Sequence, residues 1–309
     1  MSETMNEITK KLLELVSEYK GDFKGAFNIR EDGECAGRSS SKNIKIDSKT
    51  DKPGLDIHVA PGTKGETVYI PACVTKGGID DLVYNDFFIG PDCDIVIVAG
   101  CGVHTDDHSE ARHNGIHRFF VGEGSKVRYE EKHVGTGTGT GSRVIDPETD
   151  VVLEKNSYLE MNTTQISGIN HTRRKTTATC AAGSRLVVRE RLFTEKDQKA
   201  ETFFHADLNG EGASADIVSR SVAKDQSYQN YESTIVGNAP CSGHSECDAI
   251  IDDEAIVDAS PRLFARHKDA SMIHEAAIGK IAGEQILKFR TLGLTEEEAE
   301  AKIIEGFLA

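Results

Sequence analysis

Hydrophobic and polar positions follow three different patterns along the chain. In residues 5–19 apolar side chains recur at helical spacing, so the pattern predicts a helix that ends near Gly21. From residue 22 to 278 the apolar runs are short, as at 68–70 and 95–98, and Gly, Asn and Asp separate them. Short apolar runs between turn residues are typical of β-strands. We therefore expect a mainly β core over 22–278 with a helical segment, 1–21, before it.

A degenerate repeat runs through this core. A turn residue, a small residue and then strand-like residues follow one another from Gly124, Asn156, Gly183 and, more loosely, Gly212, at intervals of 27 to 32 residues. A turn and a strand repeated at such a spacing are typical of a solenoid of stacked coils. A β-sandwich with similar hairpins is the alternative that the pattern leaves open.

The chain returns to helical spacing over 279–309. A first helix is expected over 282–292, and Gly293 is a natural end for it. Thr295 and Glu298 then have the spacing of a capping box, which predicts the start of a second helix. Two helices joined by a glycine turn form a helical hairpin, and we expect its apolar face to pack on the body of the protein or on a partner. The apolar residues that we expect to dock on a partner are Ile286, Leu287, Ile303, Ile304 and Phe307.

Composition and charge narrow the classes of protein. Aromatic residues make up 6 % of the chain and glycine occurs 29 times, which suits a thin, turn-rich β architecture better than a helical core. The net charge of −15 repels phosphate backbones, so nucleic-acid binding is not expected. No signal peptide and no apolar segment of membrane-spanning length is apparent, so we expect a cytoplasmic protein that does not enter the membrane.

The seven cysteines predict thiols rather than disulfides. Their number is odd, and the chain is long and lacks a secretion signal, so reduced cysteines are the default. No CxxC pair occurs, which excludes a zinc ribbon on spacing alone. Most of these cysteines are expected to be small buried residues of the core.

A glycine run at 135–141 invites comparison with a phosphate-binding loop. Such a loop needs Gly-Lys-Ser or Gly-Lys-Thr at the start of a helix, whereas residues 143–147 look extended. A flexible loop is the better interpretation. The chain therefore supplies no recognisable ATPase of its own.

A first candidate metal site is a cluster of histidines that follows Cys101. His104, His108, His113 and His117 lie within a short segment that also holds three acidic residues. Imidazole, thiolate and carboxylate are all good ligands for transition metals. The spacing matches no established ligand pattern, so separate histidines in a solvated loop remain the alternative.

A second candidate site combines Cys247, His274 and Glu275. Cys247 and His274 are 27 residues apart, which equals the shortest repeat interval. In a solenoid they would lie on neighbouring coils, roughly 4.8 Å apart, and a thiol, an imidazole and a carboxylate could converge. Thiolate sulfur is the usual ligand of iron–sulfur clusters, and imidazole can replace it. The alternative is a cysteine buried in the core and a His-Glu pair on the surface.

These residues also carry a family resemblance, which covers roughly residues 90–309. An ordered series of segments resembles the C-terminal half of the SufB/SufD family: 243–251 (GHSECDAII), 274–281 (HEAAIGKI), 284–285 (EQ), 293–299 (GLTEEEA) and 306–308 (GFL). Segments 208–210 (LNG), 219–223 (SRSVA) and 237–239 (GNA) look like the core of the same family. The resemblance implies a right-handed parallel β-helix with terminal helices. It also implies that residues 279–309 dock a SufC-type ABC ATPase, and that two cores associate through their β-helix ends, as a homodimer or with a SufD-like partner.

The resemblance also implies roles for the second candidate site. Cys247 matches the SufB cysteine that receives sulfur or holds the nascent cluster, and His274 and Glu275 match a His-Glu pair for cluster assembly. SufD members usually lack this cysteine and have glycine after the histidine, so the chain resembles SufB. Familiar bacterial SufB chains are longer at the N-terminus and often carry a CxxCxxxC motif that is missing here. The expected function is a scaffold that holds a transient iron–sulfur cluster while a partner hydrolyses ATP.

Two other functions remain open at this point. A SufD-like structural subunit would form the same complex without its own cluster. A β-helix enzyme acting on carbohydrate would need a coherent pair of catalytic carboxylates, and none is evident.

Overall fold

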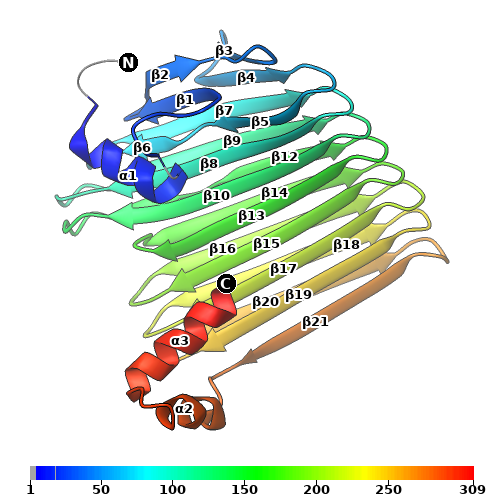
Figure 1. Ribbon diagram of the computed structural model, residues 1–309. Coiled ribbons are helices and arrows are strands. Elements are labelled where there is room, and N and C mark those ends of the chain that lie inside the picture. Colours follow the sequence, from blue (N-terminus) through cyan, green and yellow to red (C-terminus); the bar gives the residue numbers. More distant parts are fainter. Residues whose placement is uncertain (1–4, 18) are drawn as a thin grey trace.

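The chain forms a parallel β-helix of about eight turns with helices near both ends (Figure 1). The computed structural model describes residues 5–17 and 19–309. It confirms the mainly β fold, the N-terminal helix and the C-terminal helices that the sequence predicts. In chain order the elements are α1 (Glu7–Ser17), β1 (Ala26–Glu31), β2 (Glu34–Ser39), β3 (Ile44–Ser48), β4 (Gly54–Val59), β5 (Lys64–Tyr69), β6 (Ala72–Val74), β7 (Asp80–Ile89), β8 (Asp94–His104), β9 (Ala111–Val121), β10 (Lys126–Thr136), β11 (Arg143–Ile145), β12 (Glu148–Leu153), β13 (Tyr158–Ser167), β14 (His171–Cys180), β15 (Arg185–Thr194), β16 (Lys199–Leu208), β17 (Ser214–Ala223), β18 (Tyr228–Gly237), β19 (Ser242–Ile251), β20 (Ile256–Ala265), β21 (Ser271–Gly279), α2 (Gly283–Arg290) and α3 (Glu296–Leu308).

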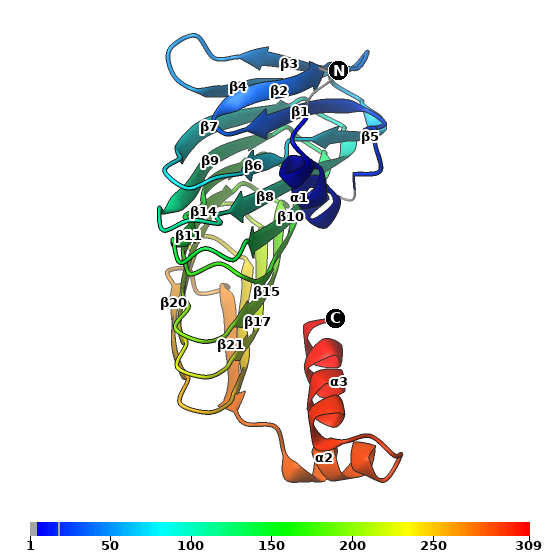
Figure 2. The ribbon, with the colours of Figure 1, turned by 90° about the vertical axis from the view of Figure 1, so that its left-hand side faces the viewer.

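Two long sheets face each other, and successive strands of the coils alternate between them. One runs β2-β1-β5-β8-β10-β13-β15-β17-β19-β21, and the other runs β20-β18-β16-β14-β11-β9-β7-β4-β3. Neighbouring strands are parallel except for the β1–β2 and β3–β4 pairs at the N-terminal end. Figure 2 shows the two sheets as separate layers seen along their edges. Parallel pairing excludes the β-sandwich alternative, because sandwich sheets are antiparallel.

The repeated motif marks one corner of each coil. Asn156, Gly183 and Gly212 adopt φ values of 56°, 66° and 74°, directly before β13, β15 and β17. Glycine and asparagine tolerate this left-handed conformation, which explains why turn residues recur there. The next residue points inward: the buried Ser157 and Ser184 hydroxyls donate to backbone carbonyls three residues earlier, at 2.6 and 2.8 Å. The motif therefore predicts the corners of the β-helix.

The interior of the coils is filled by every second residue of each strand. Phe87 of β7 and Phe119 of β9 stack in register with ring centroids 4.5 Å apart, and Tyr129 packs edge-on against Phe119. The three rings are fully buried. Such like-on-like stacking is the usual way in which parallel coils fill their core, and it agrees with the period-2 burial of the strands.

Helix α1 packs on the outer face of β8. Leu12 and Val16 are buried against Gly102 and Gly100. A Cβ atom added at Gly102 would lie 2.9 Å from the Leu12 Cβ atom, and one added at Gly100 would lie 2.4 Å from the Val16 carbonyl oxygen. Two glycines in the interior of a strand are otherwise unfavourable, so their role here is to let the helix approach the sheet. Figure 2 shows α1 lying across this face.

The glycine run begins at the end of β10 and leads to the short strand β11. Its backbone packs on the loop of the preceding coil: the Gly139 and Gly141 amides donate to the carbonyls of Thr105 and Asp107 at 3.1 and 2.9 Å. A Cβ atom at Gly141 would lie 2.0 Å from the Ser109 carbonyl oxygen. The glycines thus allow two loops to stack, and an extended strand follows them, as the sequence predicts.

The C-terminal hairpin projects beyond the last coil (Figure 2). The capping box is confirmed: the Thr295 hydroxyl accepts from the Glu298 amide, and the Glu298 carboxylate accepts from the Thr295 amide. Helix α3 turns back along the sheet, where Glu300 forms an ion pair with Lys224, the residue directly after β17. Leu287 of α2 stays 61 % exposed. None of the helices in the described part of the chain is long and apolar enough to cross a membrane.

Candidate functional site

Strands β19 and β21 place the predicted site residues at the C-terminal end of the β-helix. The two strands are parallel neighbours, with Cys247 opposite Ala276 and Ser245 opposite His274. Cys247 and His274 therefore lie on the same face of the sheet, a diagonal step apart, and this face points into the coil. Glu275 is the next residue after His274, so its side chain points to the outer face. The structure brings Cys247 and His274 onto one face and places Glu275 on the other.

The inner part of the site centres on the Cys247 thiol. Cys247 is 3 % exposed. Its partner in register on β17, the strand on the other side of β19 from β21, is Ser219. Burial, together with the nearby charges of Glu190 and Asp248, raises the pKa of the Cys247 thiol to about 12. The group is thus a thiol at neutral pH. A metal ion or a sulfur donor must displace its proton before it can act as a ligand.

The open end of the β-helix exposes the rest of the inner face. No described strand follows β21 or lies beyond β20 in its sheet, so His274 is solvent-exposed although it points along the inner face. The same end exposes several large apolar side chains. These are Ile256, Phe264, Ile273 and Ile278, which are 56, 46, 55 and 41 % exposed. An exposed apolar strand edge of this kind is a surface on which another strand can pair.

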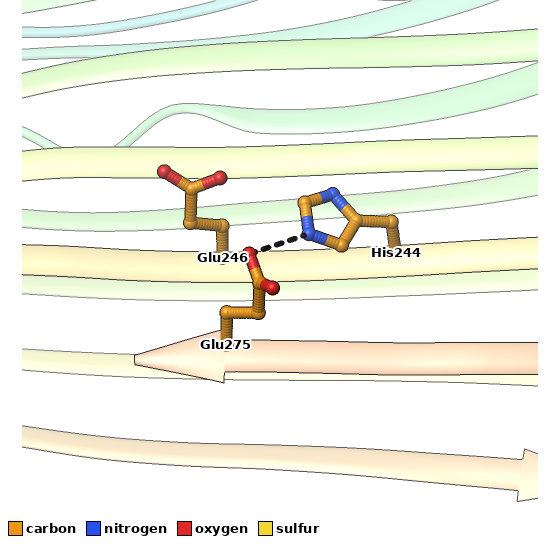
Figure 3. Close-up of side chains that lie close together, drawn as sticks. All are labelled: His244, Glu246 and Glu275. Carbon is orange, nitrogen blue, oxygen red and sulfur yellow. Dashed lines mark ion pairs between the residues drawn. The ribbon is translucent and has the colours of Figure 1, made fainter. Parts of the chain in front are cut away.

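On the outer face, Glu275 meets two residues of β19. Its carboxylate lies 3.6 Å from His244 Nε2, and Glu246 is its partner in register (Figure 3). His244, Glu246 and Glu275 each offer a ligand atom within 4.8 Å of the others, the sole such group of three or more among residues 5–17 and 19–309. Burial, and then the neighbouring Asp248, raises the pKa of Glu246. The sequence analysis singled out Glu275 but not its two partners.

The first candidate cluster is dispersed. His104 bonds Thr136 and Asp106 at the end of β8, and the exposed His108 bonds Thr140 in the glycine run. His113 is buried and bonds Asp81 at 3.0 Å, whereas Cys101 is buried on the inner face of β8. These four residues do not form a common ligand set in the described structure.

A row of buried polar side chains inside the coils leads toward Cys247. Arg174 of β14 donates to Glu131 at 2.5 Å and lies 3.8 Å from Glu190 of β15. Glu190 in turn accepts from Ser219 at 2.6 Å, and Ser219 neighbours Cys247. Burial alone would raise the pKa of Glu131, but the Arg174 charge holds it well below its usual value. The Arg174 guanidinium is thus a buried cation that faces both carboxylates.

His117, in the same interior, makes stability depend on pH. The Nδ1 atom of His117 lies 3.0 Å from the Tyr129 hydroxyl, within hydrogen-bond distance. Burial lowers the pKa of His117 to about 4. In the unfolded chain this histidine has a pKa of ~6.5. Between about pH 4 and about pH 6.5 it is therefore protonated in the unfolded state but neutral in the folded state. Stability should therefore fall as the pH drops from about 6.5 to about 4, by up to ~1.4 kcal/mol per pH unit from this residue.

Urea unfolding at pH 7.5, 6 and 5 measures this effect. We expect His117→Gln to flatten the loss of stability below pH 6.5, whereas His205→Gln should keep the full slope, because His205 lies on the outer face of β16, half-buried and paired with Asp207. An equal slope in the parent and in His117→Gln would contradict the assignment.

The fold and the site together define a β-helix protein that presents a thiol, an imidazole and a His-carboxylate group at the open end of its coils. The model of the SUF system FeS cluster assembly SufBD core domain matches residues 88–307. A SufBD family iron–sulfur cluster assembly protein of Pyrococcus horikoshii is 31 % identical over 285 residues, which cover 88 % of this chain and 83 % of that relative. One of Methanothermobacter thermautotrophicus is 29 % identical over 261 residues, or 83 % of this chain.

The chain belongs to the SufBD family of iron–sulfur cluster assembly proteins. The matched part spans 62 % of the length of the Methanothermobacter relative. Another relative in Archaeoglobus fulgidus is 27 % identical over 261 residues and matches over 69 % of its length.

Proposed function

We propose that the chain is a SufB-like scaffold on which iron–sulfur clusters are assembled. The observation that carries the proposal is the placement of Cys247 and His274 on one inner face at the open end of the β-helix. A buried thiol and an accessible imidazole can take up sulfide and iron there, away from bulk water. Glu275 acts on iron from the outer face of the same strand. The cluster is transient and is the cargo of the scaffold.

The proposal includes a partner for each exposed apolar surface. The open end, with Ile273 and Phe264, pairs with a second copy or a SufD-like chain, so that the sheets continue across the interface. The hairpin of α2 and α3 docks a SufC-type ABC ATPase, to which ATP hydrolysis belongs. Movement of the ATPase then opens the paired ends and admits iron and sulfur to Cys247.

Anaerobic reconstitution with ferrous iron and sulfide tests the proposal. We expect the parent chain to gain visible absorption and bound iron, Cys247→Ser to lose both, and His274→Ala to retain less. Cys241→Ser is the matched control, because Cys241 is another buried thiol at the same end of the β-helix.

Two results would contradict parts of the proposal. An equal cluster in all variants would move the site away from Cys247. No cluster in any chain, even with the ATPase present, would favour the alternative of a SufD-like structural subunit without its own cluster.

A further inference from the structure

The outer face of β19 and β21 carries His244 and Glu246, which the proposed cluster chemistry does not use, beside Glu275. We propose that His244, Glu246 and Glu275 form a binding site for one first-row divalent metal ion, such as Fe²⁺, Mn²⁺ or Co²⁺. The site requires neither Cys247 nor a partner chain. It lies on the opposite face of the sheet from Cys247 and His274, and Glu275 is the one residue that it shares with the proposed cluster function.

The geometry of the three side chains suits a single ion. They extend from two hydrogen-bonded strands on one face, and Figure 3 shows the His244 ring and the Glu275 carboxylate directed at each other, 3.6 Å apart, with Glu246 beside them. Ligand atoms of one ion, each about 2.1 Å from it, lie about 3–3.5 Å from one another. The ligand atoms of the three residues now lie within 4.8 Å of one another. Rotation of the side chains on fixed strands would bring these atoms into the range that one ion requires.

The imidazole of His244 is held in the orientation that metal binding needs. Its Nδ1 atom is 2.9 Å from Asp216 of β17, and Asp216 is fixed by the guanidinium of Arg189 at 2.5 Å. A carboxylate that accepts from one ring nitrogen leaves the other nitrogen free as a ligand and makes it more basic. Asp216 is therefore a positioning residue, and Nε2 of His244 is the ligand atom directed at Glu275.

The surrounding charges favour a cation at this point. Glu246, Glu275 and Asp248 project from the outer face, and Arg220 of β17 is the neighbouring cation that faces Glu246. Arg189 is occupied by Asp216. A divalent ion would relieve the remaining crowding of carboxylates.

The ligand types and the open surroundings indicate the class of metal. One imidazole with two carboxylates suits Fe²⁺, Mn²⁺, Co²⁺ or Zn²⁺, whereas thiolate-seeking ions such as Cu⁺ find no sulfur here. His244 and Glu246 border a groove of about 480 Å³ that also reaches Arg191 and the chain end at Ala309. Water or a small anion can fill the remaining coordination positions from this groove.

Titration of the purified chain with Co²⁺ tests the site, because Co²⁺ reports its ligands in its visible spectrum. We expect one equivalent to bind, with d–d bands and no sulfur-to-cobalt charge-transfer band. His244→Ala and Glu275→Gln should abolish this binding, and Asp216→Asn should weaken it about 10- to 100-fold. Cys247→Ser should bind Co²⁺ as the parent does.

His205→Ala is the matched control. His205 is also an outward-facing histidine paired with one carboxylate, Asp207 at 3.1 Å, and its replacement should leave Co²⁺ binding unchanged. Binding that survives in His244→Ala, or a charge-transfer band that is lost in Cys247→Ser, would overturn the proposal. Failure of cluster reconstitution would not affect it, because Co²⁺ binding is read without sulfide.

Discussion

We expect Arg174→Met to lower the free energy of unfolding by about 3–5 kcal/mol. Arg174 is 4 % exposed and is the cation between Glu131 and Glu190, which are 2 and 5 % exposed. Methionine fills a similar volume but leaves two buried carboxylates without their guanidinium. Each carboxylate must then take up a proton or draw water into the coil, and both responses cost stability.

Arg173→Met is the matched control for this prediction. Arg173 is the adjacent residue of β14 on the outer face, where its guanidinium lies 5.2 Å from the Phe203 ring centroid and stays exposed. We expect its loss to cost less than ~1 kcal/mol. Urea unfolding of both variants at pH 7.5 compares the two effects. Equal stability of Arg174→Met and the parent would show that the two carboxylates do not need the buried cation.

The coils themselves were predictable because their corners have a local cause. Asn156, Gly183 and Gly212 must adopt positive φ, and few residues do so at low cost, so the sequence records each corner. The end of the first C-terminal helix near Gly293 was predictable for the same reason, and the start of the second from the capping box of Thr295 and Glu298. Corners and helix ends can be predicted from the few residues that form them, without knowledge of the rest of the fold.

The buried polar row was not predictable in this way. Glu131 and His133 alternate with Glu130 and Lys132 along β10, which reads as a strand with two polar faces. Only the register of the coils shows that Glu131 points inward and meets Arg174 from another coil. The signal that the sequence does offer is the apolar pair Val127 and Tyr129, which precede Glu131 on the same face and are both buried.

The candidate site shows the same limit on a smaller scale. The 27-residue interval correctly placed Cys247 and His274 on neighbouring strands, because the length of a coil is a property of the repeat. The direction of each side chain depends on register to a single residue, so Glu275 turned to the opposite face. His244 and Glu246 flank Ser245 in the segment already under consideration, but only pairing with β21 shows that they meet Glu275.

The C-terminal hairpin of α2 and α3 is the surface on which we propose that the ATPase docks, and a substitution there is expected to weaken ATPase binding strongly. Leu287 of α2 is 61 % exposed, and in α3 only Ala299 is fully buried. Exposed apolar residues on a helical hairpin cost solubility unless a partner covers them. We expect Leu287→Asp to weaken binding of a SufC-type ATPase by about tenfold or more, because a charge is then buried in an apolar contact.

Gln285→Asp adds the same charge at an exposed, polar position of α2 and should leave ATPase binding nearly unchanged. Neither substitution should shift the melting temperature by more than a few degrees, since both side chains lie on the surface of the isolated chain. Titration calorimetry with the purified ATPase separates the two variants. If Leu287→Asp and a chain lacking 279–309 both bind as the parent does, the ATPase docks elsewhere.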